Sequence, residues 1–169
     1  MITGLVRVSR TGEAALEALA DTLSALVAGV AAGLVGDAVV IVPAPDPEVA
    51  TVVEATGATL VVAPAGRDPW RAGAAVARRE WVLCLEAGDV PGEGWIRVLD
   101  RFVATERESM TIGRARRDDG ALARLAAVLR PARGPRAGDV LRRASLATPP
   151  AGRPRVRRLS VRIEPAARD

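Results

Sequence analysis

Residues Trp81–Trp95 read WVLCLEAGDVPGEGW, and this stretch decides how the fold is interpreted. It opens with a continuous apolar run, typical of a strand buried on both faces. Glu86 and Asp89 follow directly in a turn that contains Gly88, and a Pro/Gly loop then leads to the second tryptophan. A strand that delivers carboxylates to the edge of a sheet predicts a metal or phosphate site, because divalent cations prefer oxygen ligands. We therefore expect the chemistry of this protein near this turn.

The sequence before this stretch alternates between strand and helix patterns. Short apolar runs predict strands, and the segments between them start at capping residues and carry apolar residues at helical spacing. The expected strands are Leu5–Val8, Ala38–Val42, Thr59–Val62 and Trp81–Leu85. The expected helices run from an N-cap at Thr11 through Leu34, from Asp46 to Gly57, from Asp68 to Arg78 and from Trp95 to Thr105. This alternation predicts an α/β fold, a three-layer sandwich with a mostly parallel central sheet.

Ligands of such sheets bind in the crevice at the carboxyl ends of the strands. Four loops should line that edge: Ser9–Gly12, Pro43–Pro47, Ala63–Asp68 and Glu86–Gly94. No strand is followed by Gly-x-Gly-x-x-Gly, which disfavours the dinucleotide-binding version of this architecture.

The last third of the sequence is less regular. We expect a short strand at Met110–Ile112 and a helix at Asp119–Leu129. Two linkers rich in Pro, Gly and Arg follow, at Arg130–Gly138 and Ala147–Pro154. The tail alternates apolar and polar residues, which predicts one half-buried strand at or near an edge of the sheet. Its apolar positions are Leu159, Val161 and Ile163.

Composition restricts the possible chemistry. The 169 residues suffice for one domain, and they include no His, Lys, Asn, Gln or Tyr. A histidine base, a His-coordinated metal, a Schiff-base lysine and a Ser-His-Asp triad are therefore excluded. Cys84 is the one cysteine and lies in an apolar run, so we expect a buried thiol in a reducing compartment. The N-terminus lacks a signal-peptide pattern, and we expect a cytoplasmic location.

Charge is distributed unevenly along the chain. Residues 1–100 hold 7 Arg and 13 acidic residues, a net charge of −6, whereas residues 101–169 hold 17 Arg and 7 acidic residues, a net charge of +10. Such a basic region faces an anionic membrane or lipid phosphate, nucleic acid, or only solvent. Nucleic acid is disfavoured because Phe102 is the one aromatic residue of this region. The arginines predicted to contact a membrane cluster before and in the last strand: Arg153, Arg155, Arg157 and Arg158.

Three phrases, in this order, resemble family-two glycosyltransferases of the nucleotide-sugar-binding GT-A fold. TLSALVAGVAAGLVGDAVVIV is similar to the first helix and second strand of these enzymes, and EATGATLVVAPAGR to the next helix, strand and Gly-Arg loop. RAGAAVARREWVLCLEAGDVPGEGW is similar to the following helix, strand and Asp-x-Asp type motif. The resemblance covers roughly Glu13–Phe102 and implies a single GT-A-like domain over residues 1–169. Residues 1–105 would be its nucleotide-sugar-binding half, and residues 106–169 a short, Arg-rich C-terminal part.

The resemblance also implies a divalent metal, Mn²⁺ or Mg²⁺, that bridges the diphosphate of the nucleotide sugar. Glu86 and Asp89 would be its ligands, although the second acid of a strict Asp-x-Asp falls on Gly88. Acids in a Gly-containing turn also cap backbone amides, so both interpretations stand. The residues implied to contact the nucleotide sugar are Asp46, Arg67 and Glu86. Asp46 equally fits a helix N-cap, and Arg67 a solvent-exposed arginine.

Asp139 is the candidate general base for the acceptor hydroxyl. It lies in GPRAGDVL, which resembles the Gly-Asp-Gln-Gly loop of one bacterial subgroup, and it equally fits a helix N-cap. Two functions follow for this short, motif-degenerate relative. The first is a glycosyltransferase that transfers a sugar from a nucleotide-sugar donor to a lipid or small-molecule acceptor. The second is a catalytically inactive relative that keeps the fold as a binding or interaction module. A lipid-phosphate acceptor or an anionic membrane would place the protein at the inner membrane face.

Overall fold

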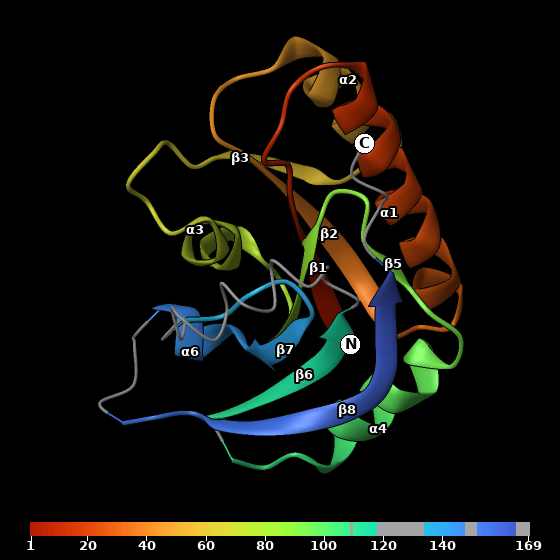
Figure 1. Ribbon diagram of the computed structural model, residues 1–169, viewed down its shortest axis with the longest axis vertical. Helices are drawn as coiled ribbons and strands as arrows, with labels where there is room; N and C mark the ends of the chain where they lie inside the picture. Colours follow the sequence, from red (N-terminus) through yellow and green to blue (C-terminus); the bar gives the residue numbers. More distant parts are fainter. Residues whose placement is uncertain (109, 118–133, 148–151, 165–169) are drawn as a thin grey trace.

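The computed structural model describes residues 1–108, 110–117, 134–147 and 152–164. Strands and helices alternate through the first half of the chain (Figure 1). They are β1 Ile2–Arg7, α1 Glu13–Ala31, β2 Val35–Val42, α2 Pro47–Thr56, β3 Thr59–Val62, α3 Pro69–Val76 and β4 Trp81–Glu86. The later elements are β5 Val90–Pro91, α4 Trp95–Thr105, β6 Thr111–Arg117, β7 Asp139–Arg142, α6 Arg143–Ala147 and β8 Arg155–Glu164. The predicted α/β fold is confirmed.

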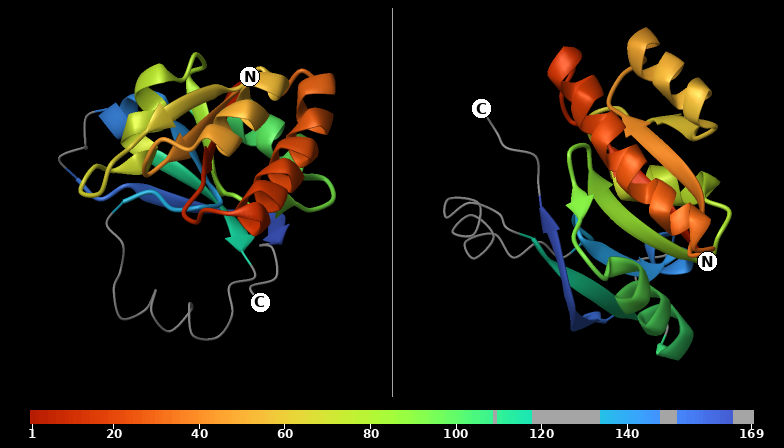
Figure 2. Two further views of the ribbon diagram at one scale, coloured as in Figure 1. Left: turned by 90° about the horizontal axis from the view of Figure 1, so that it is seen from above. Right: turned by 90° about the vertical axis from the view of Figure 1, so that its right-hand side faces the viewer.

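The strands of the described residues form one curled sheet in the order β3-β2-β1-β4-β7-β6-β8-β5 (Figure 2). The four strands β3, β2, β1 and β4 are mutually parallel, as the sequence predicted. β7 runs antiparallel to both of its neighbours, β4 and β6, and β8 runs parallel to β6. As a result β4, β6 and β8 all point in the same direction, and the sheet is mostly parallel.

Helices cover both faces of the sheet and complete the three predicted layers. α1, α2 and α4 lie on one face, and α3 and α6 lie on the other (Figure 1). On the first face a core cluster joins the strands to all three helices. Its helix residues include Leu19 of α1, Val53 of α2 and Phe102 of α4. On the second face Trp70 of α3 and Leu146 of α6 are buried in a second core cluster with the strands. Burying each such side chain stabilises the fold by about 2 kcal/mol.

Capping residues start α2 and α3 where the sequence predicted. The Oδ1 atom of Asp46 accepts hydrogen bonds from the backbone N–H groups of Glu48 at 3.0 Å and Val49 at 3.2 Å. Asp68 caps α3 in the same way, and a proline follows each cap at the start of the helix. α2 ends at Gly57, whose φ of 70° is in the left-handed region that favours glycine. Each side-chain cap contributes about 1 kcal/mol.

The start of α1 differs from the prediction. Gly12, not Thr11, occupies the N-cap, with a φ of 94°, and no side chain caps the helix. A threonine would be strained at that φ, so the chain uses glycine there and leaves the cap without a side chain. By length and composition α1 could cross a membrane, a test that core helices also pass. Its buried stripe, which includes Leu19 and Leu26, packs on the sheet.

The last third of the chain brings two corrections and one confirmation. β6 begins where the sequence predicted a strand but extends to Arg117. Asp139 begins strand β7, so its alternative role as a helix N-cap is wrong. β8 has the predicted alternation, since Leu159, Val161 and Ile163 are buried and the residues between them are exposed. The helix predicted at Asp119–Leu129 lies outside the described residues.

Candidate functional site

The loops that follow the parallel strands meet at one edge of the sheet, which we call the rim. The strand register pairs Arg7 of β1 with Ile41 of β2 and with Glu86 of β4, and it pairs Val42 with Val62 of β3. The carboxyl ends of these four strands therefore lie side by side. The prediction that their loops share one edge is confirmed.

β6 and β8 bring further residues to the same rim. Because both strands run in the direction of β4, their carboxyl ends lie at the edge where β4 ends. The register pairs Arg116 with Arg162 and Arg117 with Ile163. Arginines of the basic C-terminal region are thus part of the rim.

Asp89 of the acidic turn is fully buried and engaged on both carboxylate oxygens. Its Oδ2 atom accepts a hydrogen bond from the backbone N–H of Glu86 at 2.8 Å. Its Oδ1 atom accepts from the guanidinium of Arg117, from Nη2 at 2.7 Å and from Nε at 3.2 Å. Asp89 therefore closes the turn and ties it to the end of β6.

Gly88 explains why the turn lacks a second acid. Its φ of 95° lies in the left-handed region, where a residue with a side chain would be strained. Its backbone N–H points into the protein and donates to the hydroxyl of Thr22 at 2.8 Å and to the carbonyl oxygen of Ala18 at 2.8 Å. α1 thus holds the turn in place through Gly88.

Glu86 is paired with Arg7 at the end of β1. The Arg7 Nε atom lies 3.0 Å from one carboxylate oxygen of Glu86 and donates to the other at 3.2 Å. Burial raises the pKa of the Glu86 carboxyl, and the guanidinium groups of Arg7 and Arg117 oppose that effect. The Arg7 guanidinium also lies 5.9 Å from the ring centre of Trp70 in α3. Glu86 is therefore a partly accessible rim carboxylate with a fixed cationic partner.

Asp139, the candidate general base, forms a buried ion pair. Its side chain has no exposed surface, and both oxygens accept from the guanidinium of Arg114, from Nε at 2.7 Å and from Nη2 at 2.8 Å. The backbone N–H of Arg136 donates to the same carboxylate at 3.1 Å. An acceptor hydroxyl could reach this carboxylate only after the guanidinium moved away.

The two remaining candidates lie in rim loops. Asp46 is the N-cap of α2, as its alternative interpretation predicted, and Oδ1 is the atom that makes both cap bonds. Arg67 is exposed in the loop between β3 and α3. Among the described residues its side chain makes no ion pair, which leaves it available to solvent or to an anion. The structure therefore places all five sequence-predicted positions at or near the rim.

Solved structures similar to this one include two glycosyltransferases in complex with nucleotide sugars. Glucosyl-3-phosphoglycerate synthase from Mycobacterium tuberculosis, in complex with Mn²⁺ and UDP-glucose, has a TM-score of 0.55 and 20% identity, covering 85% of this chain and 56% of that chain. TarS from S. aureus, in complex with UDP-GlcNAc, has a TM-score of 0.57 and 13% identity, covering 100% of this chain and 59% of that chain. The fold is that of GT-A glycosyltransferases.

The likeness concerns the fold, and the chain is shorter than these proteins. It spans 56% to 59% of the length of the two solved structures. No protein-family model matches the sequence, and no curated protein matches it either.

The acidic turn does not fit the divalent metal that accompanies UDP in the synthase complexes. Both oxygens of Asp89 are engaged, Glu86 is paired with Arg7, and Gly88 offers no side chain. Each carboxylate thus already faces a guanidinium, whose positive charge would repel a cation. Within the described ranges, no group of three His, Cys, Asp or Glu side chains could hold a metal ion.

Cys84 is buried, as predicted. Burial raises the pKa of its thiol, and the carboxylates of Asp139, Asp68 and Glu86 raise it further. The thiol therefore stays protonated and does not act as a nucleophile.

Sequence reasoning missed the three arginines that organise this site. Arg7, Arg114 and Arg117 each pair with an acid that the motif analysis had assigned to metal binding or catalysis. The available signal was the position of Arg7 at the end of an apolar strand pattern, whereas Arg114 and Arg117 lie beyond the strand predicted at Met110–Ile112. That signal identifies a charged residue held near the core, but it does not identify the partner.

Proposed function

We propose that this chain binds a nucleotide sugar at the rim and acts as a glycosyltransferase-like protein related to family two. The observation that carries this proposal is the placement of the acidic turn, the strand ends of β1 and β2, and the ends of β6 and β8 on one rim of a GT-A fold. The nucleotide sugars bound by solved structures of the same fold support it. The sugar would be transferred to a lipid or small-molecule acceptor.

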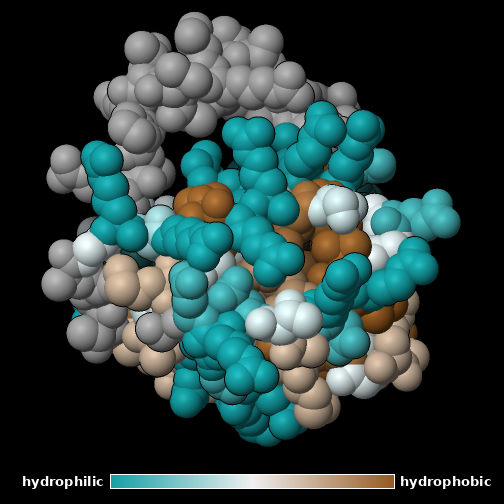
Figure 3. Space-filling view, turned by 90° about the horizontal axis from the view of Figure 1, so that it is seen from below, coloured by the Kyte–Doolittle hydropathy of each residue, from teal (hydrophilic) through white to brown (hydrophobic). Residues whose placement is uncertain are grey.

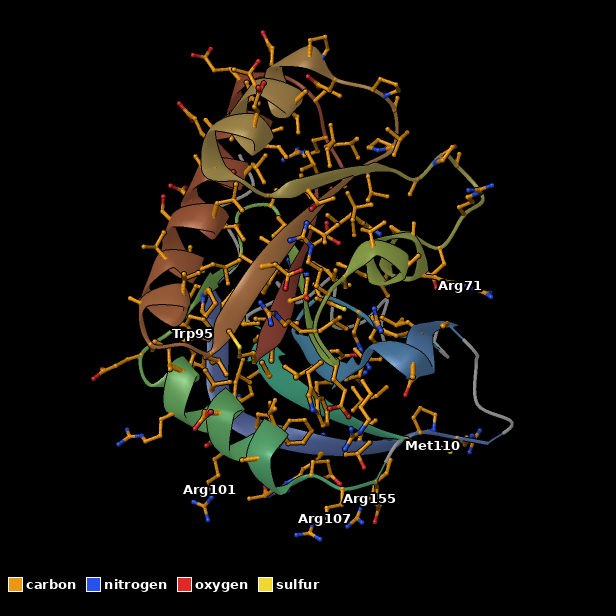
Figure 4. All side chains as sticks on the ribbon, turned by 180° about the vertical axis from the view of Figure 1, so that it is seen from behind. Arg71, Trp95, Arg101, Arg107, Met110 and Arg155 are labelled. Carbon is orange, nitrogen blue, oxygen red and sulfur yellow. The ribbon has the colours of Figure 1, made fainter. Side chains whose placement is uncertain are left out.

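A membrane-associated acceptor has partial support from the surface. One end of the molecule is covered largely by hydrophilic side chains (Figure 3), and Arg101, Arg107 and Arg155 lie along an end of it in Figure 4. Clustered arginines of this kind attract anionic lipid headgroups, each contributing about 1 kcal/mol near the surface. This end would face a lipid phosphate if the acceptor were a lipid.

The four arginines named from the sequence do not form that surface together. Strand alternation sends Arg157 toward Phe102, with its guanidinium 5.9 Å from the ring centre, and sends Arg158 to the opposite face of β8. Arg155 is 3.1 Å from a carboxylate oxygen of Glu108. A cluster in sequence becomes two separate groups because neighbouring residues of a strand point to opposite faces.

A catalytically inactive binding module is the second candidate function. It is favoured by the engagement of Asp139 with Arg114 and of Asp89 with Arg117, because these pairs occupy the carboxylates that a transfer reaction would use. As a binding module it would bind a nucleotide sugar without turnover, and as an interaction module it would need no nucleotide sugar.

The proposed function predicts that a nucleotide sugar stabilises the protein. A ligand at about a hundredfold excess over its Kd adds about 2.7 kcal/mol to the free energy of unfolding, which raises the melting temperature measurably. The measurement is a thermal-shift panel of UDP-, GDP- and TDP-sugars, with each matching nucleoside as a control. Release of nucleoside diphosphate from the stabilising sugar then separates the transferase from the inactive module. Absence of any shift across the panel would contradict the glycosyltransferase and the nucleotide-sugar-binding module, and it would leave only a module that interacts with another partner.

A further inference from the structure

Three uncompensated arginines lie together on β6 and β8, and we call them the basic rim patch: Arg116, Arg158 and Arg162. The parallel register pairs Arg116 of β6 with Arg162 of β8. Closer to the start of both strands, it pairs Arg114 of β6 with Arg158 of β8. All three side chains of the patch are exposed. None of them makes an ion pair or a side-chain hydrogen bond among the described residues. Their charges are therefore available to a ligand.

The patch faces the same side of the sheet as Glu86. In β8, Leu159, Val161 and Ile163 point into the core shared with α4, so the residues between them point to the other face. That face carries the Arg114–Asp139 ion pair, next to β4. The side chain of Glu86 points to this face as well. Its neighbour Leu85 points into the core cluster with α1 and α4, and successive residues of a strand point to opposite faces.

Over the described residues of β1, β4, β6, β7 and β8, the charge balance of this face is positive. Arg114 is neutralised by Asp139, Arg7 by Glu86, and Arg117 by Asp89. The basic rim patch adds three positive charges, and in β6 and β8 the one acidic residue is the terminal Glu164. Guanidinium groups bind phosphate oxygens in a fork of paired hydrogen bonds and stay charged at any working pH.

We propose that the basic rim patch binds the diphosphate of the nucleotide ligand without a divalent cation. The identity of the ligand as a nucleotide rests on the proposed function, whereas the patch itself is defined by its arginines. β6 is two sheet positions from β4, a separation of about 10 Å, so a diphosphate on the patch adjoins the acidic turn. The guanidinium groups of the patch balance the negative charge of the diphosphate. A metal ion would have the same role, but the carboxylates of the turn are already paired and cannot bind one.

The test is calorimetric titration with inorganic diphosphate and with UDP, each in EDTA and in Mn²⁺. Both ligands should bind in EDTA, with a Kd within about twofold of that in Mn²⁺. The double variant Arg116→Gln/Arg162→Gln should weaken both by at least about tenfold, because two charge-assisted contacts are lost. The matched control Arg78→Gln/Arg97→Gln removes the same charge from exposed positions elsewhere and should change the Kd by less than about twofold. Melting temperatures of both variants check that the fold is retained.

The outcomes show whether the patch fails, the proposed function fails, or both fail. Binding of UDP that requires Mn²⁺ overturns the patch and leaves the proposed function standing. Equal affinity of the patch variant and the control variant also overturns it, as does failure of both ligands to bind. Diphosphate binding in EDTA that no nucleotide improves supports the patch and removes the proposed function.

Discussion

Replacing Asp139 with alanine is expected to lower the free energy of unfolding by about 3–5 kcal/mol. The side chain is fully buried and accepts two hydrogen bonds from Arg114, so its removal leaves a largely buried guanidinium without this partner. The backbone N–H of Arg136 loses its acceptor as well. Such a loss is a large fraction of the stability of a domain of this size. Urea denaturation monitored by circular dichroism measures it.

Two further variants identify the cause. Asp100→Ala removes an exposed acid of α4 and should change stability by less than about 0.5 kcal/mol. Arg114→Met combined with Asp139→Ala should recover part of the loss, because it removes the unpaired charge. If Asp139→Ala costs less than about 1 kcal/mol, the carboxylate is not part of a structural ion pair.

Replacing Asp89 with alanine is expected to destabilise the fold by a similar amount, about 3–5 kcal/mol. The variant removes an ion-pair partner of Arg117 at the end of β6 and the acceptor of the Glu86 backbone N–H in the turn between β4 and β5. A metal ligand at the surface would give the opposite result, a lost metal site in a protein of unchanged stability. Denaturation midpoints with and without Mn²⁺ distinguish the two.

Glu93→Ala is the matched control for Asp89, since Glu93 is an exposed acid of the same loop. It should leave stability almost unchanged. A wild-type protein that Mn²⁺ stabilises, together with an Asp89→Ala variant that is folded but insensitive to Mn²⁺, would restore Asp89 as a metal ligand.

The parts of the fold that the sequence predicted have local causes. The four parallel strands are continuous apolar runs, and α2 and α3 begin at Asp46 and Asp68, each followed by proline. Capping and burial act within a few residues, so their signals can be read from a short window. The alternation of Leu159, Val161 and Ile163 is local in the same sense, and it predicted the face of β8 that is buried.

The parts that the sequence did not predict depend on distant partners. β7 is a four-residue strand in an Arg- and Gly-rich segment, and it forms because β4 and β6 offer it an edge on each side. Asp139 and Asp89 read as functional acids, and their structural partners Arg114 and Arg117 are 25 and 28 positions away in the sequence. In a chain with 24 arginines, no local pattern identifies which arginine pairs with which acid.

An NMR titration of the ¹⁵N-labelled protein with UDP in EDTA tests most directly whether the rim is the binding site. The chain of 17.6 kDa suits such a titration. We predict that chemical-shift changes concentrate at the loop after β1, in residues 86–94 and at Arg116 and Arg162, the strand ends that share the rim. Changes concentrated at the opposite edge, around residues 32–34 and 57–58 where β2 and β3 begin, would contradict this, as would the absence of changes at saturating UDP.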